Sequence, residues 1–223
     1  MRNVTVWIWL LFVAAPGWAV DCAALKFRGQ GYTACTVDVR HDDIRLFLRP
    51  PGAAPYGDFS ALNAALAQQN LTLSFAMNAG MYHPDRSPVG YYVEQGMTQM
   101  RLLTRASGGN FGLLPNGVIC VTDQTIEVIE TLKFAARNLA CRFASQSGPM
   151  LVIDGALHPR FLKDSRSRYI RNGVGMGAGG RQAIFVMSNS FVTLHEFASF
   201  FKDHIGVAQA LYFNGNASRL FAP

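Results

Sequence analysis

The sequence predicts a single α+β domain with a mixed, mainly antiparallel sheet and a few packed helices. Half of the 223 residues are hydrophobic and 15% are charged, which favours a substantial core and excludes a disordered chain. Many short apolar runs are separated by turn residues, whereas only two stretches have helical spacing. No Pro/Ser-rich linker divides the chain, so one domain is expected over residues 20–223.

The expected elements follow from hydrophobic periodicity. Alternation predicts strands over 32–39 and 44–48, and helical spacing predicts a helix over 59–69 with Ser60 as its cap. Further strands are expected over 71–77, 91–94, 111–121, 125–130 and 151–153. A hairpin around residues 177–180 would join Val174 to 184–188. The clearest helix covers 193–204, before a last strand over 208–213, and its inward side chains are Leu194, Phe197, Phe200 and Phe201.

Residues 1–19 have the layout of a secretory signal peptide. A short basic start precedes an apolar run over 4–15, and Gly17 and Ala19 are the small residues before a cut after Ala19. The run is shorter than the ~20 residues that cross a bilayer, and the sequence has no second run of that length. We expect an exported protein, periplasmic or secreted, with no stable membrane span after cleavage. The alternative is an uncleaved anchor.

The four cysteines agree with export. An even number in an exported chain predicts two disulfides, and four cysteines allow three pairings. We favour Cys22–Cys35 and Cys120–Cys141, because each closes a short local loop. A zinc site is the competing interpretation, but the sequence has no Cys-x-x-Cys and no histidine spaced to complete one.

The charge favours an anionic partner. The chain has 20 basic and 14 acidic residues, a formal net charge of +6, and its one dense basic run covers 163–171. No nucleic-acid module is found, so nucleic acid is not an expected partner. Arg171 enters a glycine-rich stretch, and its planar guanidinium suits phosphate or carboxylate. The alternative is a solvated surface run.

A recurring pattern is a hydrophobic strand that ends in a polar-glycine corner. It occurs at 78–80, 147–149, 154–155 and 214–215. Glycine permits positive φ and a close approach of a ligand to the backbone. If these strands share a sheet, their corners line one cleft, whereas the alternative is a set of ordinary turns. The dinucleotide, P-loop, zincin and nucleophile-elbow motifs are missing, and His83 alone of five histidines lies in a candidate cleft loop.

The order of these motifs resembles the phosphodiester glycosidase family over about residues 70–220. The segments that carry the resemblance are Asn78-Ala79-Gly80-Met81-Tyr82, Pro88-Val89-Gly90-Tyr91, Asn110-Phe111, Pro115-Asn116-Gly117-Val118, Ser147-Gly148-Pro149, Arg171-Asn172-Gly173-Val174-Gly175 and Ala210-Leu211-Tyr212-Phe213-Asn214-Gly215. That family includes the catalytic domain of the uncovering enzyme, which removes N-acetylglucosamine from a phosphodiester-linked sugar tag. The resemblance implies an exported hydrolase that cleaves a sugar from a sugar-1-phosphodiester.

One position departs from the family. Its members usually carry an Asp-Gly pair near the C-terminus, often extended as Asp-Gly-Gly-Gly-Ser, where this chain has Asn214-Gly215-Asn216-Ala217-Ser218. Asparagine keeps a hydrogen bond but cannot serve as base or nucleophile. The alternative function is therefore a catalytically degenerate binding protein for anionic envelope glycans. A third reading is an exported scaffold without a small-molecule site.

The hydrolysis defines the expected roles. A departing phosphate monoester is a weak base, so it needs charge stabilisation more than a general acid. Under this hypothesis Arg171 grips the phosphate, Asp154 is the first candidate for base or nucleophile, and Glu94 is the second. No cofactor is expected, although Asp85, Asp154 and Asn214 are oxygen donors that leave a divalent cation open. The residues expected to bind substrate are Asn78, Gly80, His83, Asn110, Ser147, Gly148, Asn172, Asn214, Gly215 and Ser218.

Overall fold

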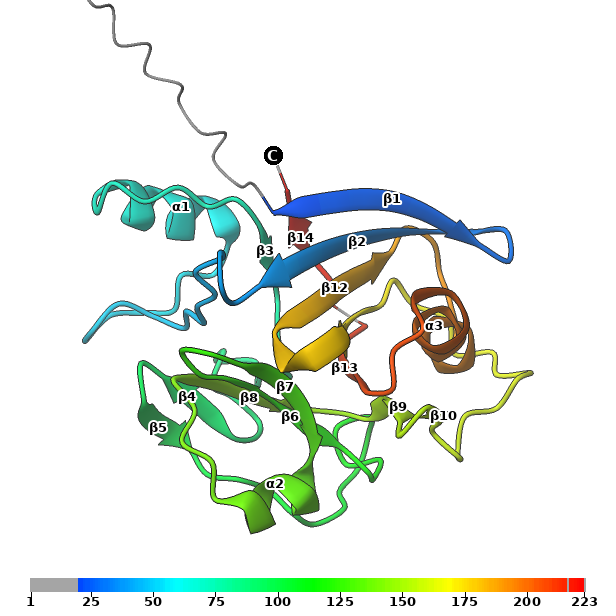
Figure 1. Ribbon diagram of the computed structural model, residues 1–223. Coiled ribbons are helices and arrows are strands. Elements are labelled where there is room, and N and C mark those ends of the chain that lie inside the picture. Colours follow the sequence, from blue (N-terminus) through cyan, green and yellow to red (C-terminus); the bar gives the residue numbers. More distant parts are fainter. Residues whose placement is uncertain (1–19, 216, 223) are drawn as a thin grey trace, which may run out of the picture.

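The computed structural model describes residues 20–215 and 217–222, so the predicted signal peptide lies outside the described residues. Two antiparallel sheets are layered face to face, and short helices cover their outer sides (Figure 1). This arrangement confirms the predicted α+β class. Every strand pairing in the described part of the chain is antiparallel.

The larger sheet has seven strands and contains both the first and the last long strands of the domain. In spatial order these are β1 (Asp21–Phe27), β2 (Gln30–Asp38), β12 (Gln182–Ser188), β11 (Asn172–Met176), β13 (Ala210–Asn214), β9 (Met150–Ile153) and β10 (Ala156–Leu157). β11 lies between β12 and β13, so the predicted hairpin around the glycines at 177–180 is confirmed. A short 3₁₀ turn, η1 (Ala178–Gly180), forms its connection.

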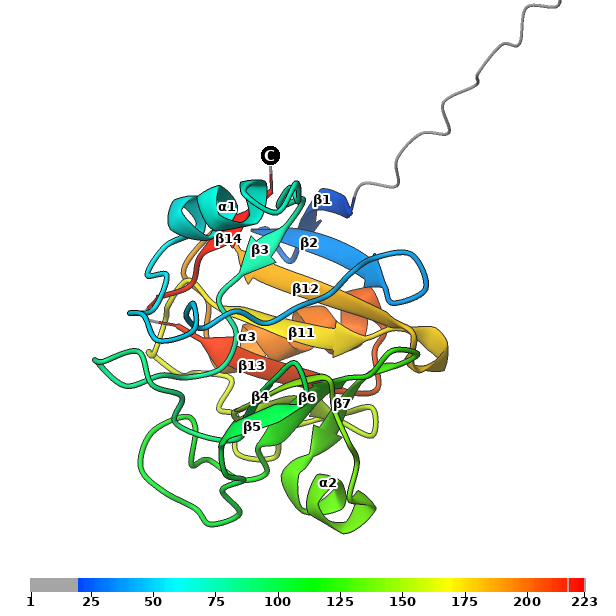
Figure 2. The same cartoon turned by 90° about the vertical axis from the view of Figure 1, so that its left-hand side faces the viewer.

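The smaller sheet has five strands, and a third sheet has two. The five are β5 (Met97–Met100), β4 (Tyr92–Glu94), β8 (Phe143–Ser147), β6 (Gly117–Val121) and β7 (Ile126–Glu130). The two-stranded sheet joins β3 (Ala76–Met77) to β14 (Leu220–Phe221), which docks the end of the chain beside Asn78. The segment over 39–58 contains no helix or strand, and it crosses in front of β12 and β11 in Figure 2.

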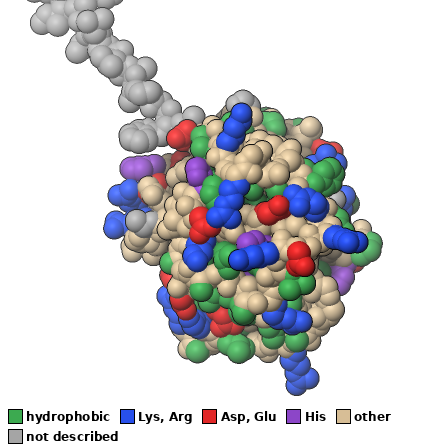
Figure 3. Space-filling model, turned by 90° about the vertical axis from the view of Figure 1, so that its right-hand side faces the viewer, with side chains coloured by type: hydrophobic (Ala, Val, Ile, Leu, Met, Phe, Trp, Pro, Cys, Tyr) green, Lys and Arg blue, Asp and Glu red, His purple; other side chains and the backbone are tan. Residues whose placement is uncertain are grey.

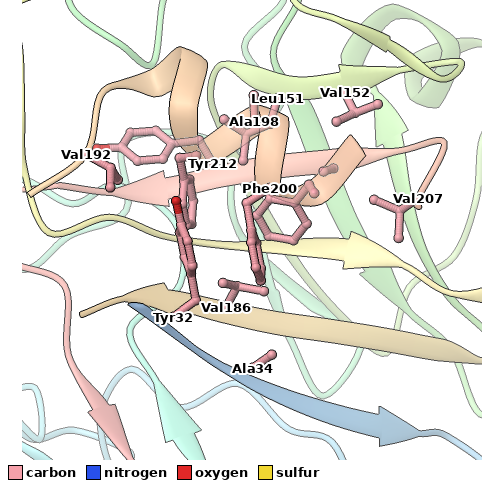
Figure 4. Packing of buried hydrophobic residues seen from close by; sticks show 13 residues of the cluster. Tyr32, Ala34, Leu151, Val152, Val186, Val192, Ala198, Phe200, Val207 and Tyr212 are labelled. Carbon is pink, nitrogen blue, oxygen red and sulfur yellow. The ribbon is translucent and has the colours of Figure 1, made fainter. Parts of the chain in front are cut away.

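The main core lies between the two large sheets. Alternate side chains of both sheets meet there, among them Ile119, Val174, Phe185 and Phe213. A second cluster packs the opposite face of the seven-stranded sheet against α3 (Leu194–Ser199) and the π-helical turn η2 (Phe200–Ile205). Figure 4 shows Tyr32 and Phe200 side by side in this cluster, with ring centroids 3.9 Å apart.

Two helices confirm their predicted positions with altered ends. α1 (Phe59–Ala67) is capped by Asp58 and not by Ser60, because the Asp58 carboxylate accepts the Ala61 N–H at 2.8 Å. α3 begins with a capping box between Thr193 and Glu196 and passes into η2. The predicted inward residues Phe197, Phe200 and Phe201 are fully buried.

Several predicted elements were wrong or missing. The expected strand over 44–48 is irregular, and of the strand over 71–77 only β3 forms. The sequence patterns also missed β1, β5, β8 and α2 (Thr131–Arg137). The half-exposed alternation of β1 and the short, fully buried run of β8 each lack the pattern of a one-sided strand.

Both predicted disulfides are confirmed. Cys22 and Cys35 are directly opposed on β1 and β2, and Cys120 on β6 is bonded to Cys141 before β8. Each bond therefore joins neighbouring segments of one sheet. Among residues 20–215 and 217–222, no helix combines the length and the apolar character that crossing a membrane requires.

Candidate functional site

A polar network forms where the ends of β3 and β13 lie beside the start of β11. Asn172 at the start of β11 is paired with Asn214 at the end of β13, and its Nδ2 donates to the Asn78 carbonyl at 2.7 Å. The Asn172 Oδ1 accepts the Asn214 backbone N–H at 3.0 Å and lies 3.3 Å from the Ser218 hydroxyl. Four residues expected to bind substrate are thus brought together, and we call Asn78, Asn172, Asn214 and Ser218 the asparagine network.

Asn78 is the member with unused hydrogen-bonding capacity. Its Oδ1 accepts the Arg219 backbone N–H at 2.7 Å and the Asn172 Nδ2 at 3.1 Å. These two donors fix the orientation of the amide. Its Nδ2 is buried and has no hydrogen-bond partner among the described residues. A buried amide donor without a partner is costly, so this atom is the natural contact for a ligand oxygen.

Arg171 lies beside the network but faces the protein interior. Its side chain is 0% exposed, and its nitrogens donate to the Val192 carbonyl, the Tyr212 hydroxyl and the Ser167 carbonyl at 2.8–3.0 Å. Burial lowers the pKa of the guanidinium, and the nearby Tyr212 opposes that shift. The expectation that Arg171 grips a phosphate directly is therefore corrected. Because the Arg171 guanidinium has no exposed surface, its role is to hold the Val192, Tyr212 and Ser167 groups to which it donates.

Tyr212 is the residue through which Arg171 acts on the site. Its hydroxyl accepts from Arg171 at 3.0 Å and also has a hydrogen bond with the Asn110 side chain. Burial raises the pKa of Tyr212, so the phenol is neutral. A Cβ added at Gly215 would lie 2.3 Å from this hydroxyl, so only glycine fits there. Asn110 and Gly215 thus share one corner with the asparagine network.

Gly80, Ser147 and Gly148 serve packing in this structure. A Cβ on Gly80 would lie 2.3 Å from the Ser145 hydroxyl, and one on Gly148 would lie 2.6 Å from Asn116. Ser147 is fully buried and donates to the Phe213 carbonyl at 3.1 Å. These three residues hold the strand ends in place beneath the network. Direct contact of these three residues with the substrate stays a prediction.

Asp154 lies at the opposite end of β13 from Asn214. It forms the turn between β9 and β10 with Gly155, and the Gly155 N–H donates to the Ala208 carbonyl just before β13 begins. Its side chain is 63% exposed and pairs with Lys133 at 3.0 Å, which lowers the pKa of the carboxyl. The structure thus does not bring Asp154 to the asparagine network, and the glycine corner there is an ordinary hairpin turn.

Glu94 and His83 are also held outside the network. The Glu94 carboxylate accepts the Tyr92 hydroxyl at 2.8 Å and the Leu48 backbone N–H at 3.2 Å, so it anchors the 39–58 segment to β4. His83 lies in the 82–88 loop, where its backbone N–H donates to the Ser87 carbonyl. Its charge lies close enough to lower the pKa of Asp85, after the larger effect of hydrogen bonds from Ser87.

The sequence reasoning missed two arginines, one of which is bonded to Asn78 and one of which lines the same cavity as Asn78. Arg219 donates its backbone N–H to Asn78 and has an exposed side chain. Arg86 is exposed, and its guanidinium lies 5.2 Å from the centre of the Tyr82 ring. Within the described residues neither guanidinium has a carboxylate within salt-bridge distance. Isolated arginines in loops give no sequence signal that separates them from ordinary surface charges.

The sequence reasoning also missed Tyr169, which lies beside Gly215 and Arg171. Its ring lies over the Arg171 guanidinium at 5.3 Å, and its Cβ would lie 3.3 Å from a Cβ added at Gly215. The side chain remains 41% exposed, so an aromatic face is open beside the corner. Aromatic residues present large apolar surface with a polar tip, which suits a ligand with both characters.

One face of the molecule carries dispersed charge. On the face in Figure 3, basic side chains are scattered among acidic ones and form no continuous patch. Among residues 20–215 and 217–222, no group of three or more His, Cys, Asp or Glu side chains could hold a metal ion. The candidate site is thus defined by amides, hydroxyls and arginines.

Comparisons with known proteins identify the family of this chain. The family model of the phosphodiester glycosidases matches residues 72–222. The uncharacterized protein YigE of Escherichia coli (strain K12) is 31% identical over 216 residues, which are 96% of this chain and 84% of the relative. The catalytic domain of zebrafish N-acetylglucosamine-1-phosphodiester alpha-N-acetylglucosaminidase, auto-inhibited by its pro-peptide, has a similar fold with a TM-score of 0.58 and 13% identity, covering 91% of this chain and 72% of that one. This chain therefore belongs to the phosphodiester glycosidase family.

Proposed function

We propose that the protein is an exported hydrolase that cleaves a sugar from a sugar-1-phosphodiester. The observation that supports it best is the asparagine network, which gathers amide and hydroxyl groups at one edge of the sheet in a member of this family. Export is part of the proposal. It is supported by the layout of residues 1–19 and by two disulfides, which persist in oxidising compartments.

The proposed reaction breaks the bond between the sugar C1 and the phosphate oxygen. Water forms the new bond to C1 and loses one proton to solvent or a base, and the electron pair of the broken bond leaves with the phosphate. The products are a free sugar and a phosphomonoester. Because the departing phosphomonoester is a weak base, fixed positive charge assists its departure more than a proton donor does.

The described residues can supply these roles around Asn78. The unpartnered Asn78 Nδ2 and the amides of the network would bind sugar hydroxyls or phosphate oxygens. Arg86 and Arg219 would bind the phosphate, since neither is paired with a described carboxylate. Arg171 is a positioning residue that holds Tyr212 and the corner at Gly215. Asp154 and Glu94 have no reacting role here, and the proposal includes no cofactor.

A second candidate function is a binding protein for anionic envelope glycans. The observation that favours it is the composition of the asparagine network, which contains amides and a hydroxyl but no carboxylate. The position where family members usually carry an aspartate is Asn214 here. Such a site would retain a ligand without activating water.

The test is turnover of a panel of N-acetylglucosamine-1-phosphodiesters by the exported protein, with and without EDTA. We expect one free sugar for each phosphomonoester released, and the same rate of release with and without EDTA. Asn78→Asp keeps an acceptor for Arg219 and Asn172 but removes the free Nδ2 donor and adds negative charge. Its kcat/KM should therefore fall at least about tenfold, the loss of one charged-group hydrogen bond.

The matched control is Asn189→Asp, because Asn189 is exposed and bonds Thr33 away from the network. Its kcat/KM should equal that of the wild type. Binding of the esters without release of sugar would favour the glycan-binding protein. Neither release nor binding would overturn both functions.

A further inference from the structure

A cavity of about 480 Å³ lies beneath the 39–58 segment and reaches Asn78. Its walls come from that segment, from α1 and from the residues that lead into β3, and its floor comes from both large sheets through Ile119, Val121, Phe185 and Phe213. This volume falls within the range of about 300–1,000 Å³ typical of small-molecule sites. Figure 2 shows the segment passing over the larger sheet on this side of the molecule.

The cavity lining is more apolar than polar, although Asp42, Asp43 and Arg45 also belong to it. Ile44, Leu46 and Leu48 contribute apolar side chains from the 39–58 segment, and Leu73, Phe75 and Met77 contribute them from the residues that lead into β3 and from β3 itself. All six line the cavity, and all six are only partly buried. Ile44, Leu46, Phe75 and Met77 also pack against the core between the two large sheets, so the cavity opens beside that core. A cavity of this size with a mainly apolar lining is typical of a small-molecule site.

Part of the cavity lining can form hydrogen bonds. Asn78, Tyr82 and Arg86 belong to the lining, together with Ser145 and Gln146 of β8. Asn78 belongs both to the cavity and to the asparagine network, so the two are continuous. Arg86 adds a positive charge to the lining, and its guanidinium contacts the Tyr82 ring but no described carboxylate within salt-bridge distance. A ligand that spans both parts must carry an anionic, hydrogen-bonding group next to an apolar chain.

We propose that the aglycone of the substrate carries an apolar hydrocarbon chain, which this cavity holds while the phosphate and sugar lie at Asn78 and Arg86. This inference rests on the proposed function, because it assigns the group on the far side of the phosphodiester. A sugar or peptide aglycone would place hydroxyls or amides against the side chains of Leu73, Phe75 and Leu46, which offer no hydrogen bond. An apolar chain loses only its contact with water there.

The test compares esters of N-acetylglucosamine-1-phosphate that differ only in the alkyl group, namely methyl, hexyl and decyl, below their micelle concentrations. Each buried methylene is worth roughly a fourfold change, so kcat/KM should rise at least about a hundredfold from methyl to decyl. Leu73→Trp and Leu46→Trp fill the cavity from opposite walls and should flatten this dependence. Leu132→Trp is the control, since Leu132 is exposed on α2 and does not line the cavity.

Calorimetric binding of decyl phosphate separates this inference from the proposed function, because that probe has no glycosidic bond. Thermal unfolding of each variant verifies that it is folded. If no ester is cleaved, yet decyl phosphate binds the wild type and Leu132→Trp but not the two cavity variants, the cavity assignment is supported and the hydrolase is overturned. If methyl and decyl esters are cleaved equally and decyl phosphate does not bind, the hydrolase stands and the apolar aglycone is wrong.

Discussion

Asn214 decides at the scale of one residue whether the site hydrolyses or only binds. Its Oδ1 accepts the Gly215 N–H at 2.6 Å, and an aspartate oxygen can accept the same bond. Asn214→Asp therefore supplies a carboxylate that can keep this bond. If the site is a weak hydrolase, this carboxylate can take the proton of water, and kcat should rise at least about a hundredfold, at the low end of general-base contributions. Steady-state kinetics on the phosphodiester panel measures it.

Asn172→Asp is the matched comparison for Asn214→Asp. The Asn172 Nδ2 donates to both the carbonyl and the side-chain oxygen of Asn78, and an aspartate would place an oxygen against these two acceptors. This variant should lose activity and stability together. A wild type that already turns over rapidly, with no gain from Asn214→Asp, would show that the family's aspartate is dispensable in this protein.

Individual residues show what sequence reasoning could and could not assign. The strand-end pattern placed Asn78 and Asn214 in one site, the segments compared with the family added Asn172 and Ser218, and these four residues do share a network. The direction of Arg171 could not be predicted, because its partners Val192 and Tyr212 lie more than 20 residues away in the sequence. Burial of a charged side chain depends on such distant carbonyls and hydroxyls, and local composition does not reveal them.

At the scale of an element, the packing of β11 against η2 requires glycine at a position that the sequence suggested for ligand binding. A Cβ on Gly175 would lie 2.8 Å from a ring carbon of Phe201 and 3.0 Å from a methyl of Val207. Both neighbours are in the closely packed cluster beneath η2. Gly175→Ala should lower the free energy of unfolding by about 1–3 kcal/mol, the usual cost of overpacking.

Urea unfolding measures the effect of Gly175→Ala, with Gly108→Ala as its control. An added Cβ at Gly108 meets no atom within 4 Å, and that position has no positive φ. The control should change stability by less than about 0.5 kcal/mol. Equal stability of the two variants would mean that β11 and η2 can separate without loss.

Elements with only one buried face were predictable from their hydrophobic periodicity. The helix at 194–205 and the strands β2 and β12 show that contrast in their burial, and their positions were predicted. The segment over 44–48 has the same alternation but finds no strand partner, since its backbone lies beside the cavity. Periodicity reports which side chains face inward, whereas strand formation also requires a neighbouring backbone.

At the scale of the whole molecule, the site depends on long-range closure. β14 at the end of the chain pairs with β3, and this pairing brings the Arg219 N–H to Asn78. The sequence patterns gave no strand at 220–221, so they could not predict that the C-terminus completes the network. The two disulfides close sequence separations of 13 and 21 residues, so they constrain pairs of neighbouring segments and leave this long-range closure to strand pairing.

The pH dependence of the whole fold should reflect His158. This side chain is buried against Phe161, its Nε2 lies 3.2 Å from the Leu114 carbonyl, and its Nδ1 accepts the Arg160 N–H at 3.2 Å. A neutral ring satisfies both bonds, and burial lowers the pKa of His158 in the folded protein. The unfolded chain, with a histidine pKa of about 6.5, therefore binds a proton first as pH falls. Stability should fall below about pH 6.5, with a limiting slope of roughly 1.4 kcal/mol per pH unit from this group.

Urea unfolding of the wild type and of His158→Gln between pH 5 and 8 tests this dependence. The variant removes the titrating ring, so its stability should be lower at pH 8 but should fall less on acidification. His195→Gln is the control, because His195 is only partly buried and lies on the outer turn of α3, and its pH profile should follow that of the wild type. If His158→Gln and the wild type lose stability in parallel between pH 6.5 and 5, other groups control the acid sensitivity. In that case, protonation of His158 would make no measurable contribution to the pH dependence of the free energy of unfolding.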